Sequence, residues 1–235
     1  MNTRYQWLFF DLDRTLLDFD RSADIALEKA MLSKGMAYKA VYLSQYKKIN
    51  KACWLAYEQG RISSEELAGL RFDLFFKELG IQADPFAFNT HYLDQLAANG
   101  FLIEGCQSLL SELDKHFRML IITNGLQAVQ GRRIQQMGLT HYFEKIIISQ
   151  EIKVAKPYPG FFEEAFRNAD QPSKSDVLVI GDSLNTDIKG GNDFGLDTCW
   201  FNPTQTDHPE QIQPTYQVHS LKQLEDQLLK TVAFD

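Results

Sequence analysis

The sequence has no long hydrophobic run. No stretch approaches the roughly 18 consecutive apolar residues that a membrane span requires. The apolar run in the opening segment, MNTRYQWLFF, is shorter than the roughly 7–15 residues of a signal peptide. We therefore expect a cytoplasmic protein without a membrane partner.

The sequence has few cysteines and fewer basic than acidic side chains. The three cysteines, Cys53, Cys106 and Cys199, lie far apart and form no CxxC pair, which argues against a disulfide framework and a zinc site. Acidic side chains outnumber basic ones by 31 to 24, giving a net charge of -7. Because binding to a nucleic-acid polymer requires a basic surface, we expect no such partner. A small phosphorylated metabolite is compatible with this charge, since a local lysine and a metal ion can hold it.

Short apolar runs that stop at polar residues predict buried strands. Five such runs occupy residues 7–10, 119–122, 146–148, 177–180 and 198–201. Helical patterns occupy residues 105–115, 126–137, 160–169, 186–194 and 221–229, the last opening with Ser220 and Gln223 as a capping box. Alternating strands and helices predict an α/β fold, a doubly wound parallel sheet with helices on both faces.

The interval between the first two predicted strands is helical in pattern. Ser63 and Glu66 form a second capping box, and glycines such as Gly35 and Gly80 mark breaks. We predict a helical domain of residues 20–100 inserted into a core of residues 1–19 and 101–235. Its aromatic side chains are either the core of this domain or a surface for stacking on a nucleobase, and their helical spacing favours the core.

Two carboxylates, Asp11 and Asp13, follow the first predicted strand at positions i and i+2 and point to the same side. Beside a phosphate, one can attack phosphorus and the other can protonate the leaving oxygen and later activate water. A plain polar loop or a metal site would show the same pattern.

Other polar residues follow the next predicted strands. The hydroxyl of Thr123 and the backbone of Asn124 are suited to holding phosphate oxygens, or they cap a helix. Lys156 is suited to balancing the charge of a nucleophile and a phosphoryl group, or it is a surface lysine.

Asp182 and Asp187 lie five residues apart after the fourth predicted strand and are suited to Mg²⁺, or Asp182 caps a helix. Because the carboxyl ends of parallel strands meet at one edge of the sheet, all these groups together predict a magnesium-dependent phosphoryl-transfer site there.

Four segments, DLDRT, IITNG, the lysine of VAKP and GDSLNTD, resemble the four signature motifs of the haloacid dehalogenase-like superfamily, in the family's order. The resemblance covers essentially the whole chain and implies a Rossmann-like core with an inserted helical cap. By the same resemblance, Asp11 is the nucleophile and Asp13 the general acid and base. Thr123 and Asn124 then belong to the phosphate-binding segment together with Lys156, the charge-balancing lysine.

For the metal, the resemblance implies that Asp182 and Asp187 are the metal-site acids and that Asp11 and the backbone carbonyl of Asp13 complete the Mg²⁺ shell. One departure is Arg14, where the family usually has glycine. We expect arginine to be compatible with this turn if its φ is negative.

Within the superfamily, the segments DRTLLDFD, TNGLQAVQGRRIQQMGLTHYF and DTCWFNP resemble bacterial pyrimidine 5′-nucleotidases that remove noncanonical nucleotides. Phosphoglycolate phosphatases and other relatives share these motifs in part, and a phosphomutase would share every signature motif. Phosphoglycolate or sugar-phosphate phosphatases and phosphomutases therefore stay as alternatives. A haloacid dehalogenase lacks the second acid, so Asp13 favours phosphoryl chemistry, and the intact motifs argue against a non-catalytic binding protein. Both a monomer and a homodimer are compatible with the sequence.

Overall fold

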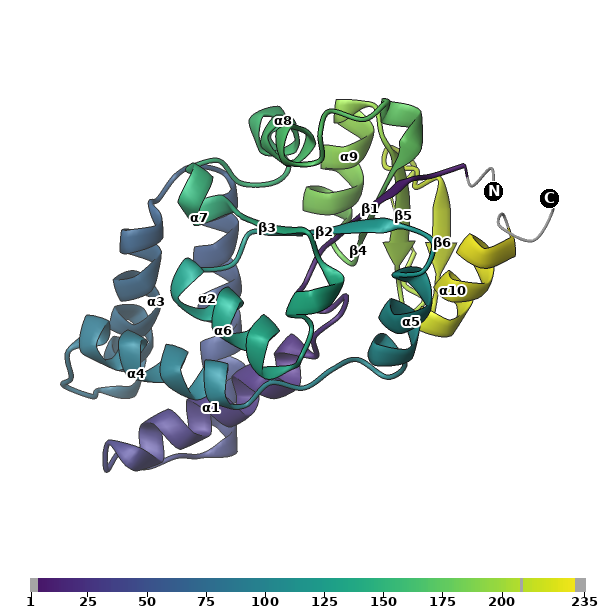
Figure 1. Cartoon of the computed structure of the whole chain (residues 1–235). Coiled ribbons are helices and arrows are strands. Elements are labelled where there is room, and N and C mark those ends of the chain that lie inside the picture. Colours follow the sequence, from purple (N-terminus) through teal and green to yellow (C-terminus); the bar gives the residue numbers. More distant parts are fainter. Residues whose placement is uncertain (1–3, 208, 231–235) are drawn as a thin grey trace. The chain divides into compact units, whose positions relative to one another are not determined.

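The computed structural model describes residues 4–207 and 209–230. Its six strands are β1 (Trp7–Phe10), β2 (Arg118–Thr123), β3 (Lys145–Ile148), β4 (Val177–Gly181), β5 (Asp197–Phe201) and β6 (Tyr216–Val218). They form one parallel sheet in the order β3-β2-β1-β4-β5-β6 (Figure 1). The predicted α/β fold class with a parallel sheet is therefore confirmed.

The register of the sheet aligns the ends of its central strands. Phe10, the last residue of β1, is level with Ile121 of β2 and with Ile180 of β4. The residues that follow these positions therefore leave the sheet at the same edge. All four residues of β1 are buried, as expected for a central strand of a sheet that is covered on both faces.

Helices pack on both faces of this sheet. The helices that accompany it are α5 (Cys106–Leu113), α7 (Ser149–Ile152), α8 (Pro159–Asn168), α9 (Lys189–Phe194) and α10 (Leu221–Lys230). Phe161 and Phe162 of α8 pack against Phe9 and Val179 of the sheet in one buried cluster. The opposite face carries α5 and α10, which contact each other (Figure 1).

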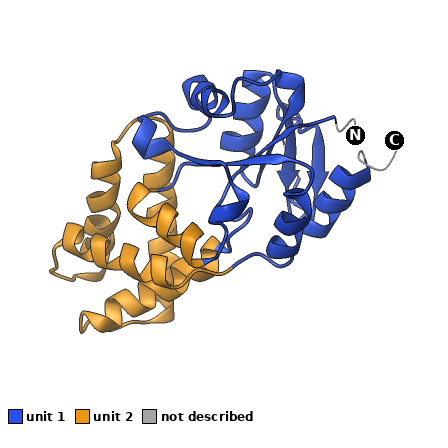
Figure 2. Cartoon of the chain, viewed as in Figure 1, with its two compact units in different colours: residues 1–18, 102–125, 137–235 blue, residues 19–101, 126–136 orange. Residues whose placement is uncertain are grey.

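The chain divides into two compact units (Figure 2). Among the described residues, the sheet unit comprises residues 4–18, 102–125, 137–207 and 209–230. The helical unit comprises residues 19–101 and 126–136. This division places residues 126–136 with the helical unit, whereas the sequence analysis assigned them to the core.

Five helices make up the helical unit: α1 (Phe19–Ser33), α2 (Ala40–Glu58), α3 (Ser64–Leu79), α4 (Pro85–Ala98) and α6 (Gln127–Gln136). Phe72 lies at the centre of its core, with its ring centroid 5.2 Å from that of Tyr46 and 4.9 Å from that of Phe88. Most aromatic side chains of this segment therefore build its core, as their spacing predicted. The capping box of Ser63 and Glu66 at the start of α3 is confirmed.

All three cysteines are free and buried. Among residues 4–207 and 209–230, no helix combines the length and the apolar character that crossing a membrane would require.

Candidate active site

Lys156 is the centre of a buried ion cluster at the carboxyl edge of the sheet. Its ammonium group donates to Oδ1 of Asp11 at 2.7 Å, to Oδ1 of Asp187 at 2.6 Å and to the carbonyl oxygen of Ile122 at 2.7 Å. These three bonds use all three hydrogens of the ammonium group. Burial by itself would lower the pKa of Lys156, but the carboxylates of Asp11 and Asp187 outweigh it and raise that pKa. The lysine is therefore a fixed positive charge and not a solvated surface residue.

Asn124 holds the backbone of Lys156 in place. Its side-chain oxygen accepts a hydrogen bond from the backbone N–H of Lys156 at 2.8 Å, and its side-chain nitrogen donates to the carbonyl oxygen of Lys156 at 2.9 Å. The peptide bond between Lys156 and Pro157 is cis. Both ends of the Asn124 amide thus bond the lysine segment, and any contact of Asn124 with a phosphate would come from its backbone N–H.

Thr123 is the last residue of β2 and is buried. Its hydroxyl oxygen accepts a hydrogen bond from the backbone N–H of Gly125 at 3.1 Å. This bond closes a tight turn directly after the strand, and α6 begins only at Gln127. Thr123 therefore does not cap that helix, and the turn fixes its hydroxyl at the same sheet edge as Asp11.

Asp187 lies in a single π-helical turn, Leu184–Ile188, between β4 and α9. The side-chain oxygen Oδ2 of Asp187 accepts a hydrogen bond from the backbone N–H of Ser183 at 3.1 Å, so both of its carboxylate oxygens have partners. A Cβ atom on Gly181 would lie 2.3 Å from Oδ2 of Asp187. Glycine at position 181 is therefore required for the close approach of this carboxylate to the end of β4.

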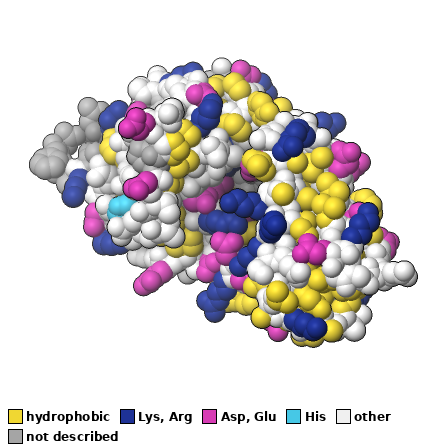
Figure 3. All heavy atoms as spheres, turned by 180° about the vertical axis from the view of Figure 1, so that it is seen from behind, with side chains coloured by type: hydrophobic (Ala, Val, Ile, Leu, Met, Phe, Trp, Pro, Cys, Tyr) yellow, Lys and Arg dark blue, Asp and Glu magenta, His cyan; other side chains and the backbone are white. Residues whose placement is uncertain are grey.

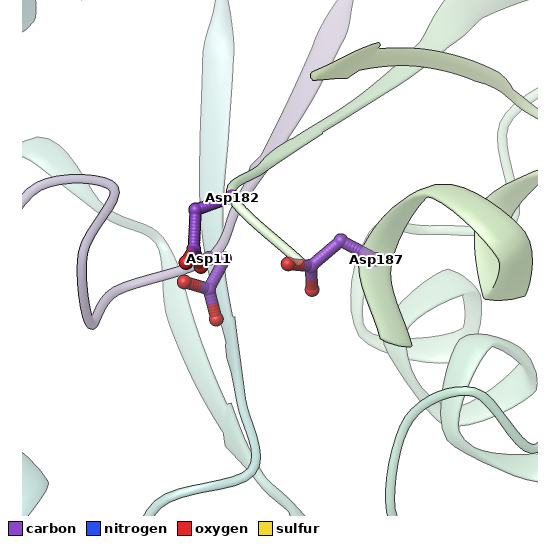
Figure 4. A group of neighbouring side chains, drawn as sticks. All are labelled: Asp11, Asp182 and Asp187. Atoms are coloured by element: carbon purple, nitrogen blue, oxygen red, sulfur yellow. The ribbon is translucent and has the colours of Figure 1, made fainter. Parts of the chain in front are cut away.

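Asp182 follows β4 and brings a third carboxylate to the cluster. Its carbonyl oxygen accepts a hydrogen bond from the indole N–H of Trp200 at 2.8 Å, which anchors the loop to β5. The carboxylates of Asp11 and Asp182 lie next to each other, and that of Asp187 points toward them (Figure 4). One oxygen from each of the three lies within 4.8 Å of the others.

This grouping leaves excess negative charge in a buried place. Burial raises the pKa of Asp11 to about 7, with Asp187 and Asp13 adding to the rise and Lys156 opposing it. Burial, together with the charges of Asp11 and Asp187, raises the pKa of Asp182 well above its usual range. Uncompensated buried carboxylates are costly, and three carboxylate oxygens this close suit a hard divalent cation such as Mg²⁺. The donor set therefore fits the predicted metal.

The turn that follows Asp13 holds Arg14 in an unusual backbone conformation. The backbone N–H of Arg14 donates to the carbonyl oxygen of Leu17 at 2.7 Å, and the N–H of Leu17 donates to the carbonyl oxygen of Leu12 at 2.9 Å. To close this turn, Arg14 adopts a φ of 67°, in the left-handed region. The condition stated for arginine at this position, a negative φ, is therefore not met, and the turn holds Arg14 in the left-handed region. Asp13 is half-buried, and its role as the acid stays a prediction.

Two residues of the site escaped the sequence analysis. The hydroxyl of Thr15, which is fully buried, donates to Oδ2 of Asp11 at 3.1 Å and fixes the orientation of that carboxylate together with Lys156. Trp200 holds the Asp182 loop, as described above. Thr15 falls two positions after Asp13, and this spacing was the available signal; no signal in the sequence singled out the contact of Trp200.

Comparisons with known proteins agree with this geometry. Residues 5–195 match the haloacid dehalogenase-like hydrolase family. The chain is 38% identical over 229 residues to the pyrimidine 5′-nucleotidase PynA of Streptococcus pneumoniae, covering 97% of each chain. It is 36% identical over 227 residues to the pyrimidine 5′-nucleotidase YjjG of Escherichia coli, covering 97% of this chain and 99% of the relative.

A solved structure shows the same fold over nearly the full length. The HAD-hydrolase YfnB of Bacillus subtilis, described as bound to magnesium, superposes with a TM-score of 0.90 at 36% identity, covering 96% of this chain and 99% of that one. The family match, the similar relatives and the arrangement of the carboxylates around Lys156 all point to the same family. The chain belongs to the haloacid dehalogenase-like hydrolase family.

Proposed function

We propose that the protein is a Mg²⁺-dependent phosphatase that hydrolyses small phosphate monoesters through an aspartyl-phosphate on Asp11. The observation that carries this proposal is the buried cluster in which Lys156 bonds both Asp11 and Asp187 while Asp182 completes a group of three close carboxylates. Such a cluster provides a fixed nucleophile, a fixed positive charge and a set of oxygen ligands at one edge of the sheet.

In the first step, a carboxylate oxygen of Asp11 attacks phosphorus, and the bond between phosphorus and the leaving oxygen breaks. Asp13 gives its proton to that oxygen. In the second step, Asp13 takes a proton from a water molecule as that water attacks the phosphorus of the aspartyl-phosphate. The bond between Asp11 and phosphorus breaks, which releases inorganic phosphate and restores the Asp11 carboxylate. The bonds from Thr15 and Lys156 support this role, because they hold the Asp11 carboxylate in one orientation.

The metal would be held by side-chain oxygens of Asp11 and Asp182, with Asp187 beside them and the backbone carbonyl of Asp13 as a further ligand. When bound, Mg²⁺ supplies charge neutralisation for the phosphoryl group and for the buried carboxylates. Because both oxygens of Asp187 already have partners, we propose that Asp187 acts mainly by positioning Lys156 and the Ser183 loop. Thr123 and the backbone N–H of Asn124 are the proposed phosphate-binding groups.

Asp13 separates this reaction from dehalogenation. A halide departs as a stable anion and needs no proton, whereas the alkoxide that leaves a phosphate monoester does. A second carboxyl group directly after the nucleophile therefore supports phosphate esters as the substrate class.

For the substrate itself, we propose pyrimidine nucleoside 5′-monophosphates. The relatives PynA and YjjG, both named pyrimidine 5′-nucleotidases, match this chain over almost its full length. The groups proposed at the sheet edge would contact only the phosphate, so we assign discrimination among leaving groups to the helical unit. Acidic and basic side chains are interspersed on the face shown in Figure 3, which supports a small substrate over a nucleic-acid polymer.

The test is a phosphate-release screen in Mg²⁺ with pyrimidine and purine nucleoside monophosphates, sugar phosphates, phosphoglycolate and an oligonucleotide. We expect pyrimidine nucleotides to give the highest kcat/KM and the oligonucleotide to give none, with Asp11→Asn as the inactive control. A sugar phosphate or phosphoglycolate that exceeds every nucleotide by about tenfold would contradict the substrate and leave the phosphatase reaction standing. Absence of phosphate release from all of them would contradict the reaction itself.

A further inference from the structure

Arg14 occupies a backbone conformation that costs free energy for any residue with a Cβ atom. Its φ is 67°, and the backbone bond from Arg14 to Leu17 closes the turn in that conformation. Glycine would meet the needs of the turn without this cost. A strained residue that persists at the edge of a candidate site suggests a use for its side chain.

The position of Arg14 indicates what that use is. It lies between Asp13 and Thr15, and it is exposed while Thr15 is fully buried. It follows Asp13 directly and precedes Thr15, whose hydroxyl donates to Oδ2 of Asp11, so its backbone lies in the turn that holds the nucleophile. The charge of its guanidinium group also opposes the rise in the pKa of Asp182. Arg14 therefore places a positive charge beside the carboxylate cluster from the solvent side.

Negative charge exceeds positive charge at the site, so a further cation would assist the binding of a phosphate. The nearby carboxylates are those of Asp11, Asp13, Asp182 and Asp187, and the hydrogens of Lys156 are all bonded to Asp11, Asp187 and Ile122. A divalent cation would offset only part of this negative charge. A phosphate monoester adds further negative charge, so its binding requires another cationic donor.

We propose that Arg14 is a substrate-binding residue whose guanidinium group donates hydrogen bonds to the phosphate oxygens of the bound monoester. Two parallel N–H groups of arginine match two phosphate oxygens, which lysine cannot reproduce. Arg14 acts on binding of the phosphate and leaves the attack by Asp11 and the proton transfer by Asp13 unchanged. This inference rests on the proposed phosphatase function.

The test compares Arg14→Gly, Arg14→Gln and Arg14→Lys with the full-length wild type. Lys153→Gly is the matched control, because Lys153 is an exposed lysine with a φ of 58°, and its replacement removes one positive charge and the same kind of backbone strain. Binding of inorganic phosphate in Mg²⁺ is measured by calorimetry, Tm by thermal unfolding, and kcat and KM by phosphate release.

We expect both glycine variants to raise Tm, since glycine relieves the strain at a positive φ. Among these variants, only those of Arg14 should bind phosphate more weakly, by about tenfold for Arg14→Gly and Arg14→Gln, the effect of one lost charge-assisted hydrogen bond. Their KM should rise by a similar factor with kcat almost unchanged, and Arg14→Lys should recover part of the loss.

If Arg14→Gly and Arg14→Gln bind phosphate as tightly as the wild type and have the same KM, the inference is overturned. In that case an active wild type still upholds the proposed function. An equal loss of phosphate binding in Lys153→Gly would also overturn it, because the effect would then be one of general charge. A wild type that neither binds nor releases phosphate would overturn the proposed function and this inference together.

Discussion

Replacement of Lys156 by methionine tests the ion cluster on which the site depends. Methionine fills a similar volume but carries no charge, so Lys156→Met removes the bonds to Asp11, Asp187 and Ile122 at 2.6–2.7 Å. Lys156 is only 1% exposed, and water cannot replace the lost ammonium group without opening the site. The variant therefore leaves the carboxylates of Asp11 and Asp187 buried without their cation.

The expected cost depends on pH. Breaking a buried ion pair by removing one partner typically costs about 3–5 kcal/mol in the free energy of unfolding, and we expect this loss at about pH 8. Burial already raises the pKa of Asp11 to about 7 in the presence of Lys156, and the pKa rises further without it. The folded variant therefore takes up protons as the pH falls, and its loss should shrink to about 1–2 kcal/mol near pH 5.

Urea unfolding in the presence of a chelator measures this loss. The chain has three tryptophans, of which Trp7 and Trp200 lie in the sheet unit and Trp54 in the helical unit, so a Trp54→Phe background restricts the fluorescence signal to the sheet unit. Lys153→Met, three positions away and exposed, is the matched control and should change stability by less than about 0.5 kcal/mol. A loss below about 1 kcal/mol at pH 8, or an equal loss at both pH values, would refute the reasoning.

Two further variants and two changes of conditions test other parts of the account. Asp11→Asn should lose several orders of magnitude in kcat while keeping its circular dichroism spectrum, because an amide cannot attack phosphorus; normal phosphate release would contradict the nucleophile. Asp13→Asn should lose about 10²–10⁴-fold with an alkyl phosphate and less with an activated aryl phosphate, which needs no acid in the first step, and equal losses would count against the acid. In chelator, phosphate release should stop, and Ca²⁺ should restore it poorly because it takes more ligands at longer distances than Mg²⁺. The metal-free protein should also become less stable as the pH rises from about 5 to 8, since the raised pKa of Asp11 makes the folded state bind more protons, and a Tm that rises over this range would contradict the buried cluster.

The sequence was informative where strands are buried on both faces. The runs at β1, β2, β3, β4 and β5 are apolar and stop at polar residues, so their positions could be predicted within a residue or two. β6 reads Tyr-Gln-Val and is only partly buried at the edge of the sheet, so no apolar run marks it. Edge strands carry less of the pattern on which such predictions depend.

Local bonds decided the features that the sequence left unpredicted. The helix expected at residues 186–194 begins with the π-helical turn Leu184–Ile188, where Asp187 bonds Lys156 and Ser183. Lys156 is distant from Asp187 in the chain, so this partner cannot be read from the local pattern. The left-handed φ of Arg14 has a local origin, because backbone bonds within residues 12–17 impose it on whatever residue is present.

The sequence also identified which residues gather at the sheet edge, but not how each is used. Asp11, Lys156, Asp182 and Asp187 do lie together, because parallel strands end at one edge. The backbone of Asn124 stays a predicted phosphate-binding group, and no pattern in the sequence indicated that its side chain bonds the backbone of Lys156. Side-chain partners of this kind depend on three-dimensional packing and cannot be read from spacing.

The covalent step at Asp11 is the central claim, and chemical trapping tests it most directly. Borohydride reduces an acyl phosphate to an alcohol, so enzyme quenched during turnover with a nucleoside monophosphate should yield homoserine at position 11 in the peptide map. Enzyme quenched without substrate and the Asp11→Asn variant should yield none. An active enzyme that is unmodified at position 11, or modified at another residue, would contradict the account.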